Sequence, residues 1–140
     1  MHNIPTDTKW ADTIVVNTTE YRFPNKINWN QLQTIYGSNN LLFVNFEENH
    51  YTHFKTNTTI DINYYKPSSL FELSVILNSC RLFIGTLSSP LSVALSLYRP
   101  CIIGFNFNSG DLFYRLFFTL VENMNLSYYN ECENAVYLMV

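Results

Sequence analysis

Residues 81–105 read RLFIGTLSSPLSVALSLYRPCIIGF and contain two short apolar runs, LFIG and CIIGF. Both runs combine Ile with Phe, which is typical of buried strands. Between them, TLSSP has the small and turn-forming residues of a loop, and residues 89–97 repeat apolar side chains at helical spacing. Pro90 suits the first turn of that helix, where a missing N–H leaves no hydrogen bond unmade. The stretch therefore predicts a strand, a turn, a helix and a second strand.

The same alternation of short apolar runs and longer helical patterns extends along the rest of the chain. Further strands are predicted at TIVVN (13–17), LLFVNF (41–46), more weakly at 60–63, and at AVYLMV (135–140). Gly37 is typical of a helix end, and Ser69 with Glu72 three residues later is typical of a helix start. The predicted helices cover 28–37, 47–56, a segment beginning at Ser68 or Ser69, 89–97, and Asp111 to Asn123.

Strands that are apolar throughout indicate a sheet that is covered on both faces. Strand–helix alternation gives parallel pairing with right-handed crossovers. We therefore predict an α/β fold: a three-layer α/β/α Rossmann-like domain with a mostly parallel sheet. The 140 residues are expected to form a single domain, with 1–12 as an N-terminal extension. The side chains expected to be almost fully buried are Val15, Phe43, Phe83, Ile84 and Ile102.

The composition excludes several classes of protein. With 47% hydrophobic and 14% charged residues, the chain is too apolar for disorder. A net charge of −3 gives no electrostatic reason to expect a nucleic-acid partner. Neither a signal-peptide pattern nor a transmembrane segment is recognised. The three cysteines are widely spaced and form no metal-binding pattern, so reduced thiols and a cytoplasmic location are expected.

The residues that follow the predicted strands are candidates for a binding site. In open α/β sheets, ligands bind beyond the carboxyl ends of the strands, here at 17–22, 45–50, 86–90 and 106–111. The hydroxyl groups of Thr86, Ser88 and Ser89, together with N–H groups at the helix start, have the chemistry to bind a phosphate. The serines are equally suited to capping the helix, and TLSSP matches neither a Walker nor a GxGxxG pattern. Both interpretations stay open.

Other polar residues in these loops also have two interpretations. Arg22 has the planar fork that pairs with a diphosphate, or it lies on the surface. Glu47 and Glu48 are suited to bonding a ribose or a base, or they favour a helix N-terminus. His50 and His53 share one helical face but have no third ligand in the sequence, so no metal site is predicted.

Residues 69–105, SLFELSVILNSCRLFIGTLSSPLSVALSLYRPCIIGF, resemble the donor-binding half of the family-nine, heptosyltransferase-like glycosyltransferases. In that family, a helix rich in Leu, Glu and Ala leads into a strand. A Gly-Asn-Asp-Ser-Gly-Pro-Met-His turn follows, then a second helix, a proline and another strand. IVVNTTEYRFPNKINW and LLFVNFEENHYTHF resemble the preceding strands and loops more loosely. The matching positions are Leu70, Glu72, Leu73, Phe83, Ile84, Gly85, Ser88, Pro90, Ala94, Leu95, Leu97, Pro100, Cys101, Ile102 and Ile103.

The resemblance implies one half of a GT-B glycosyltransferase that binds a nucleotide-sugar donor without a metal ion or another cofactor. It assigns no catalytic residue in this chain. The donor-binding residues that it implies are Thr18, Thr19, Arg22, Glu48, Gly85, Thr86, Ser88 and Ser89.

Departures from the family pattern affect the expected activity. Thr86 and Leu87 stand where the family has Asn-Asp, Ser89 replaces the second glycine, and Ser92 replaces the histidine. The family also builds its active site between two Rossmann-like domains, and this chain resembles the second. We expect a domain that is inactive alone and pairs with a sister domain or a second copy. The alternative is a non-catalytic Rossmann-like module that binds a nucleotide, or a protein partner through the aromatic residues between 105 and 118.

Overall fold

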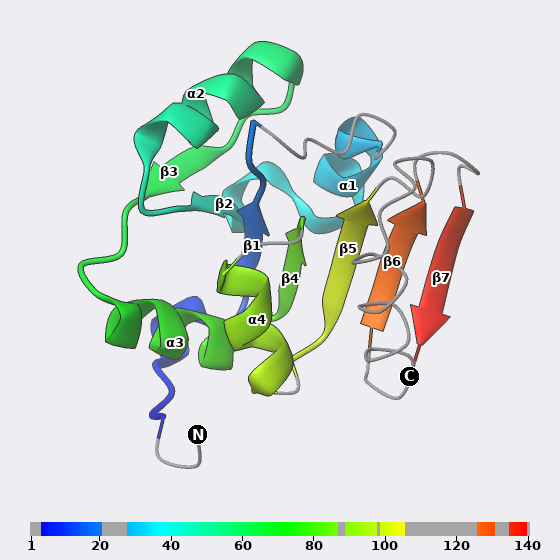
Figure 1. Cartoon of the computed structure of the whole chain (residues 1–140). Helices are drawn as coiled ribbons and strands as arrows, with labels where there is room; N and C mark the ends of the chain where they lie inside the picture. Colours follow the sequence, from blue (N-terminus) through cyan, green and yellow to red (C-terminus); the bar gives the residue numbers. More distant parts are fainter. Residues whose placement is uncertain are drawn as a thin grey trace.

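A computed structural model of the chain describes residues 4–20, 28–86, 89–97, 99–105, 126–130 and 135–139 (Figure 1). Short 3₁₀ helices lie at Thr8–Trp10 (η1) and Ser38–Asn40 (η2). The α-helices are α1 (Trp29–Tyr36), α2 (Glu48–Asn57), α3 (Leu70–Ser79) and α4 (Ser89–Ser96). The strands are β1 (Ile14–Asn17), β2 (Leu41–Val44), β3 (Asn63–Tyr65), β4 (Leu82–Gly85), β5 (Cys101–Phe105), β6 (Leu126–Asn130) and β7 (Ala135–Met139).

The described strands form one sheet in the order β3-β2-β1-β4-β5-β6-β7 (Figure 1). Along this order, each pair of neighbouring strands from β3 through β2, β1, β4 and β5 to β6 is parallel. The last strand, β7, is antiparallel to β6. The chain winds from β1 through β2 to β3 on one side, and then continues from β4 to β5 on the other side of β1. The winding direction therefore reverses between β1 and β4. The predicted α/β fold with a mostly parallel sheet is confirmed.

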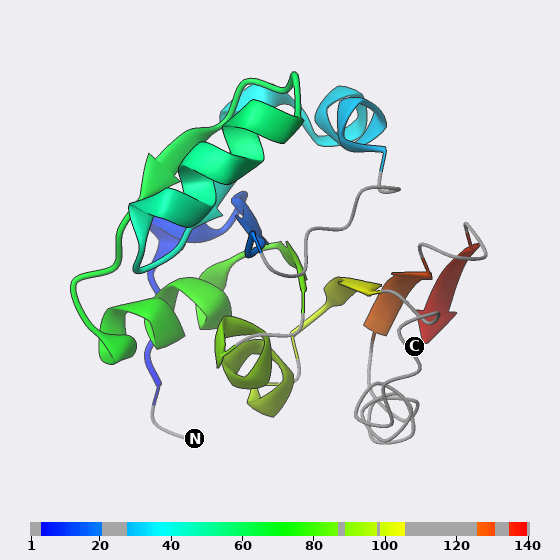
Figure 2. The ribbon, with the colours of Figure 1, turned by 45° about the horizontal axis from the view of Figure 1, so that its top comes forward.

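Helices cover both faces of the sheet. Viewed with its upper edge turned forward, the molecule has α1 and α2 on one side of the strands and α3 and α4 on the other (Figure 2). Successive side chains of β1 point to opposite faces. Ile14 and Val16 join the apolar cluster under α1 and α2, whereas Val15 joins the cluster under α3 and α4. This is the predicted three-layer α/β/α arrangement.

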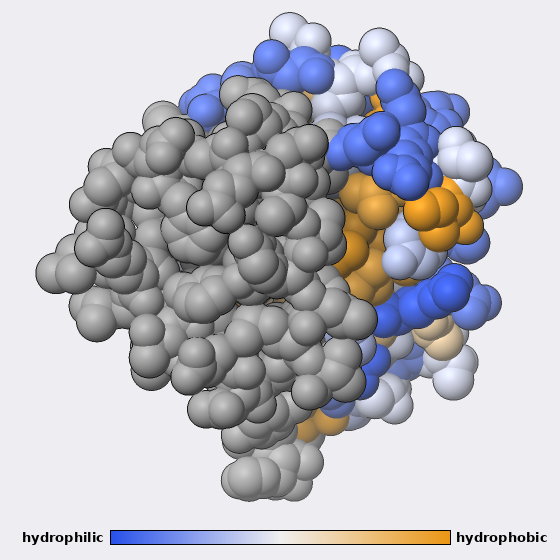
Figure 3. Space-filling model, turned by 90° about the vertical axis from the view of Figure 1, so that its right-hand side faces the viewer, coloured by the Kyte–Doolittle hydropathy of each residue, from blue (hydrophilic) through white to orange (hydrophobic). Residues whose placement is uncertain are grey.

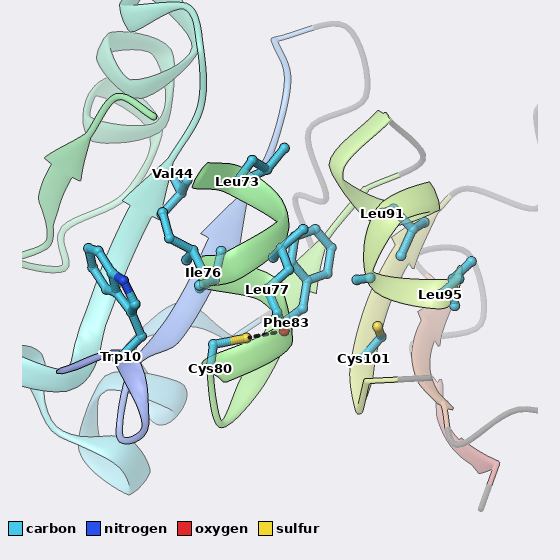
Figure 4. Packing of buried hydrophobic residues seen from close by; sticks show 12 residues of the cluster. Trp10, Val44, Leu73, Ile76, Leu77, Cys80, Phe83, Leu91, Leu95 and Cys101 are labelled. Atoms are coloured by element: carbon cyan, nitrogen blue, oxygen red, sulfur yellow. Dashed lines mark hydrogen bonds between the residues drawn. The ribbon is translucent and has the colours of Figure 1, made fainter. Parts of the chain in front are cut away.

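The core beneath α3 and α4 is built from aliphatic side chains around Phe83 (Figure 4). Ile76, Leu77 and Phe83 are completely buried, and burying each stabilises the fold by about 1.5–3 kcal/mol. Trp10 closes one side of this core and packs edge-on against Tyr65, with 5.1 Å between the ring centroids. Part of the expected N-terminal extension therefore contributes to the core.

The core beneath α1 and α2 is largely aromatic. Phe54 of α2 lies 4.9 Å from Trp29 of α1 and 5.2 Å from Phe43 of β2, measured between ring centroids. Tyr51 and Tyr64 stack at 5.1 Å beside them. Such pairs add about 0.5–1.5 kcal/mol each beyond the area that they bury. The contacts hold α2 against the outer end of the sheet.

Several predicted details need correction. The third strand is Asn63–Tyr65 rather than 60–63, because Ile60 and Ile62 are buried in the core ahead of the strand and do not join the ladder. Val15, Phe43, Phe83 and Ile84 are completely buried, but Ile102 is only half-buried at the margin of its cluster. The strand Leu126–Asn130 was not predicted. The predicted helix from Asp111 to Asn123 lies outside the described residues.

The surface on the β7 side is described only in part. There, the described residues are mostly hydrophilic, with a larger apolar patch at mid-height and a smaller one at the lower edge (Figure 3). Among the helices that the structure describes, none combines the length and the apolar character needed to span a membrane.

A candidate ligand-binding cleft at the sheet edge

A cleft of about 210 Å³ opens at the carboxyl ends of β1 and β2, beside the start of α4. It lies where the winding of the sheet reverses, which is the usual position of ligands in open α/β sheets. Six of its eight lining residues are polar. The cleft is lined by Asn17, Thr19, Asn45, Phe46, Glu47, His50, Ser89 and Pro90.

The floor of the cleft is fixed by Asn17, the last residue of β1. Its side-chain Nδ2 donates a hydrogen bond of 2.7 Å to the carbonyl oxygen of Val44, at the end of β2. Its own carbonyl oxygen accepts a 3.2 Å hydrogen bond from the N–H of Thr86, just beyond β4. Asn17 is 1% exposed, and these bonds compensate for burying its polar groups. One residue thus joins the ends of three strands.

Gly85 allows β4 to lie this close to β1. A Cβ atom at this position would lie 2.5 Å from the carbonyl oxygen of Asn17 and 2.8 Å from ring carbons of Phe83. The oxygen belongs to the main chain and cannot rotate away. The absence of a side chain at Gly85 is therefore a condition for the observed strand ends.

The wall after β2 is a turn held by Asn45. Its Oδ1 accepts a 2.9 Å hydrogen bond from the N–H of Glu47, so the side chain bridges the residue between them. Its N–H donates to the carbonyl oxygen of Tyr65 at 3.3 Å, and its carbonyl oxygen accepts from the Tyr64 hydroxyl at 2.8 Å. The main chain on the amino side of Phe46 is thereby tied to β3.

His50 of α2 connects two walls of the cleft. Its Nδ1 accepts a hydrogen bond of 3.3 Å from the N–H of Glu20, in the segment after β1. A ring nitrogen that accepts carries no proton, so in the neutral ring the proton is on Nε2. That nitrogen lies 3.3 Å from Oε2 of Glu47. The side chain of His50 is 9% exposed, so it serves as an internal link between α2 and the segment after β1.

Two threonine hydroxyls next to β1 have unused hydrogen-bonding capacity. The Oγ1 atoms of Thr18 and Thr19 are buried and find no hydrogen-bond partner within the described ranges. Thr19 lines the cleft, whereas Thr18 is completely buried beside it. A buried hydroxyl without a partner is unfavourable by roughly 1–3 kcal/mol. A polar ligand that reached the Thr19 hydroxyl would remove this penalty.

The charge of the described cleft is negative. Glu47 is its charged lining residue, and Glu48 follows at the exposed start of α2. Desolvation raises the pKa of the nearby Tyr64 hydroxyl, and the charge of Glu48 raises it further. The lining residues that the structure describes include no lysine or arginine. In the same part of the chain, no three His, Cys, Asp or Glu side chains are grouped to hold a metal ion.

The residues expected from the sequence to bind a donor fall into three groups. Thr19 and Ser89 line the cleft together. Thr18, Gly85 and Thr86 are buried at the ends of β1 and β4, and Glu48 is exposed beside Glu47. Arg22 and Ser88 lie outside the described residues, as do the side chains between 105 and 118.

The structure adds cleft residues that the sequence analysis did not assign to a donor: Asn17, Asn45, Phe46, His50 and Pro90. A signal for two of them is present in the sequence. Asn17 and Asn45 each come directly after an apolar run, and a polar residue at the end of a buried strand often faces a site. His50 and Phe46 carry no comparable signal, because their orientation depends on how α2 packs.

Comparisons with known proteins concern the fold. No protein-family model matches the chain, and no curated protein matches its sequence. Among solved structures, the chain is similar to the crystal structure of the glycosyl transferase family 9 protein from Veillonella parvula DSM 2008. The sequence identity is 17% and the TM-score 0.48, over 71% of this chain and 30% of that one. The chain thus spans less than a third of the matched protein.

Proposed function

We propose that this chain is the nucleotide-sugar-binding domain of a glycosyltransferase, and that the nucleoside diphosphate of the donor occupies the cleft. The observation that supports this most directly is the position of the cleft. It lies where the winding direction of the chain through the sheet reverses, next to the start of α4. The resemblance of residues 69–105 to a donor-binding half supports the assignment of the donor as a sugar nucleotide.

In this proposal, the diphosphate lies against Ser89 and the first turn of α4. The start of a helix presents unpaired N–H groups and a partial positive charge, both of which favour phosphate. The hydroxyl group of Thr19 donates to a phosphate oxygen and so gains the partner that it lacks. Arg22 is the proposed source of positive charge. The carboxylate of Glu47, which lines the cleft, accepts hydrogen bonds from ribose hydroxyls.

Thermal unfolding of the chain tests the proposal. Nucleoside diphosphates and nucleotide-sugars are expected to raise the melting temperature, since a ligand at 100 times its Kd stabilises the folded state by about 2.7 kcal/mol. Thr19→Val keeps the shape of the side chain and removes its hydroxyl, so it should weaken ligand binding. The matched control is Thr56→Val, on the exposed surface of α2. If none of these ligands shifts the melting temperature, the proposal is wrong.

We further propose that the domain binds the donor without transferring the sugar by itself. Thr86, Leu87 and Ser92 replace the Asn, Asp and His of the family turn, so groups expected near the sugar and phosphates are missing. A radiolabelled nucleotide-sugar incubated with the purified chain should remain intact, with or without simple acceptors. Turnover by the purified chain would contradict this and would place the catalytic groups elsewhere in it.

A further inference from the structure

We infer that Phe46 is a stacking platform for the nucleobase of the ligand and a determinant of specificity for nucleotides over base-free phosphates. This inference rests on the proposed function, because it assigns a role within the same cleft. Phe46 lines the cleft and is 38% exposed, whereas the other phenylalanines of β2, α2 and β4 are completely buried. An aromatic ring left accessible beside polar walls has a face available for another planar group.

The main chain on both sides of Phe46 is held in place before any ligand arrives. The hydrogen bond from the Glu47 N–H to Oδ1 of Asn45 spans Phe46, and Asn45 is itself bonded to Tyr64 and Tyr65. Glu47 leads directly into α2, which the aromatic core anchors to the sheet. A ring on a tied main chain loses less conformational entropy on binding than a ring on a free loop.

The spacing of the strands favours the base over the phosphates as the group that meets Phe46. Phe46 follows β2, and the start of α4 follows β4, with β1 between them. Neighbouring strands lie about 4.8 Å apart, so the two positions are separated by roughly 10 Å along the sheet edge. A nucleoside diphosphate is long enough to place its phosphates at Ser89 and its base over Phe46. Inorganic pyrophosphate reaches only the first position.

The test compares ligands with and without a base on the full chain. Calorimetric titrations use ADP, GDP, UDP and inorganic pyrophosphate with the wild type, Phe46→Ala and Phe46→Trp. Phe46→Ala is expected to weaken the best nucleoside diphosphate by about 5- to 150-fold, the range seen when stacking aromatics are replaced by alanine. Its affinity for pyrophosphate should change less than twofold. Phe46→Trp should keep the nucleotide affinity and show a change of indole fluorescence with the nucleotide but not with pyrophosphate.

A matched control is available in Phe71→Ala, because Phe71 is 59% exposed at the start of α3 and is not a lining residue of the cleft. This variant should bind every ligand as the wild type does. Nucleotide binding that is unchanged in Phe46→Ala, or an equal loss for nucleotide and pyrophosphate, would overturn the inference and leave the proposed function standing. If the wild type binds neither nucleoside diphosphates nor pyrophosphate, the proposed function fails and this inference fails with it.

Discussion

At the scale of single residues, the ends of β1 and β4 are held together by a contact that leaves no room for a methyl group. Asn17 bonds to β2 with its side chain and to Thr86 with its main chain, while Gly85 lies against its carbonyl oxygen. The geometry of the cleft floor therefore depends on the side-chain amide of Asn17 and on the absence of a side chain at Gly85.

Gly85→Ala tests this contact. The added carbon would lie 2.5 Å from the Asn17 carbonyl oxygen, so the strands must separate or the main chain must bend. We expect the free energy of unfolding to fall by about 1–3 kcal/mol, which is typical of overpacked cores. Urea unfolding followed by circular dichroism gives this value. The double variant Gly85→Ala/Phe83→Leu lacks the contact between the added carbon and the Phe83 ring but keeps the contact with the Asn17 carbonyl oxygen, so it should not regain stability. If Gly85→Ala alone is as stable as the wild type, β4 is free to shift away from β1.

The same residues show how far the sequence predicts the site. Thr19 and Ser89 follow from the rule that ligands bind beyond the carboxyl ends of parallel strands, without knowledge of the strand order. Phe46 and His50 lie in the loop and helix after β2, but the sequence does not say which of their neighbours point inwards. Glu47 faces the cleft and Glu48 does not, although the two carboxylates are adjacent and chemically alike.

At the scale of elements, α3 begins with a hydrogen-bond network around one carboxylate. Oγ of Ser69 accepts from the N–H of Glu72 at 3.1 Å, as the sequence predicts. The Glu72 carboxylate accepts from the Tyr65 hydroxyl and from the Ser68 N–H, both at 2.6 Å. The network connects the end of β3 to the first turn of α3.

Ser69→Ala removes the cap of α3. The N–H of Glu72 then loses its side-chain partner, and we expect the free energy of unfolding to fall by about 1 kcal/mol. Ser96→Ala is the control, because Ser96 lies exposed in the last turn of α4 and caps no helix start. Equal stabilities of Ser69→Ala and Ser96→Ala in urea unfolding would contradict a stabilising role for the cap.

Glu72 also gives the protein a predictable response to acid. The hydrogen bond from Tyr65, followed by that from the Ser68 main chain, lowers the pKa of the Glu72 carboxyl from its ordinary value of 4.5. A lowered pKa in the folded state stabilises the fold above the ordinary value, and this contribution is lost as the pH falls through the lowered value. The stability difference between wild type and Glu72→Gln should therefore shrink between pH 6 and pH 3. A difference that stays constant over this range would exclude a role for ionised Glu72.

The elements themselves are predictable to different degrees. β1, β2, β4 and β5 are continuous apolar runs, and their burial on both sides is what makes them recognisable. β3 contains Asn63, Tyr64 and Tyr65, and its most apolar neighbours, Ile60 and Ile62, precede the ladder. β6 reads LSYYN, in which no apolar run is long enough to indicate a strand.

At the scale of the whole molecule, the layer of α3 and α4 shields the side chains that pack beneath it from solvent. Cys80 and Cys101 are each 1% exposed within this layer. The Cys80 thiol donates a hydrogen bond to the carbonyl oxygen of Leu77 (Figure 4), and the Cys101 thiol donates one to the carbonyl oxygen of Arg99. Arg99 also donates from its side chain to the carbonyl oxygen of Cys80 at 2.6 Å, which ties the end of α3 to the start of β5.

This layer should protect both thiols from alkylation. Burial raises the pKa of Cys80 to about 11 and that of Cys101 to about 12, so the reactive thiolate is scarce at neutral pH. We expect iodoacetamide at pH 8 to leave both residues unmodified in the native protein and to modify them fully in urea. Peptide mass mapping distinguishes the two states. Rapid native labelling of Cys80 or Cys101 would show that the layer opens frequently.

The central position of β1 has a consequence for how the protein is made. Ile14 pairs with Leu41 on one side and with Leu82 on the other, so β1 lies between β2 and β4, and β4 is synthesised well after both of them. Until β4 emerges, one edge of β1 carries free N–H and C=O groups, which other chains are able to pair with. The half formed by β1, β2 and β3 is therefore exposed to aggregation during synthesis, and the arrival of β4 ends this exposure.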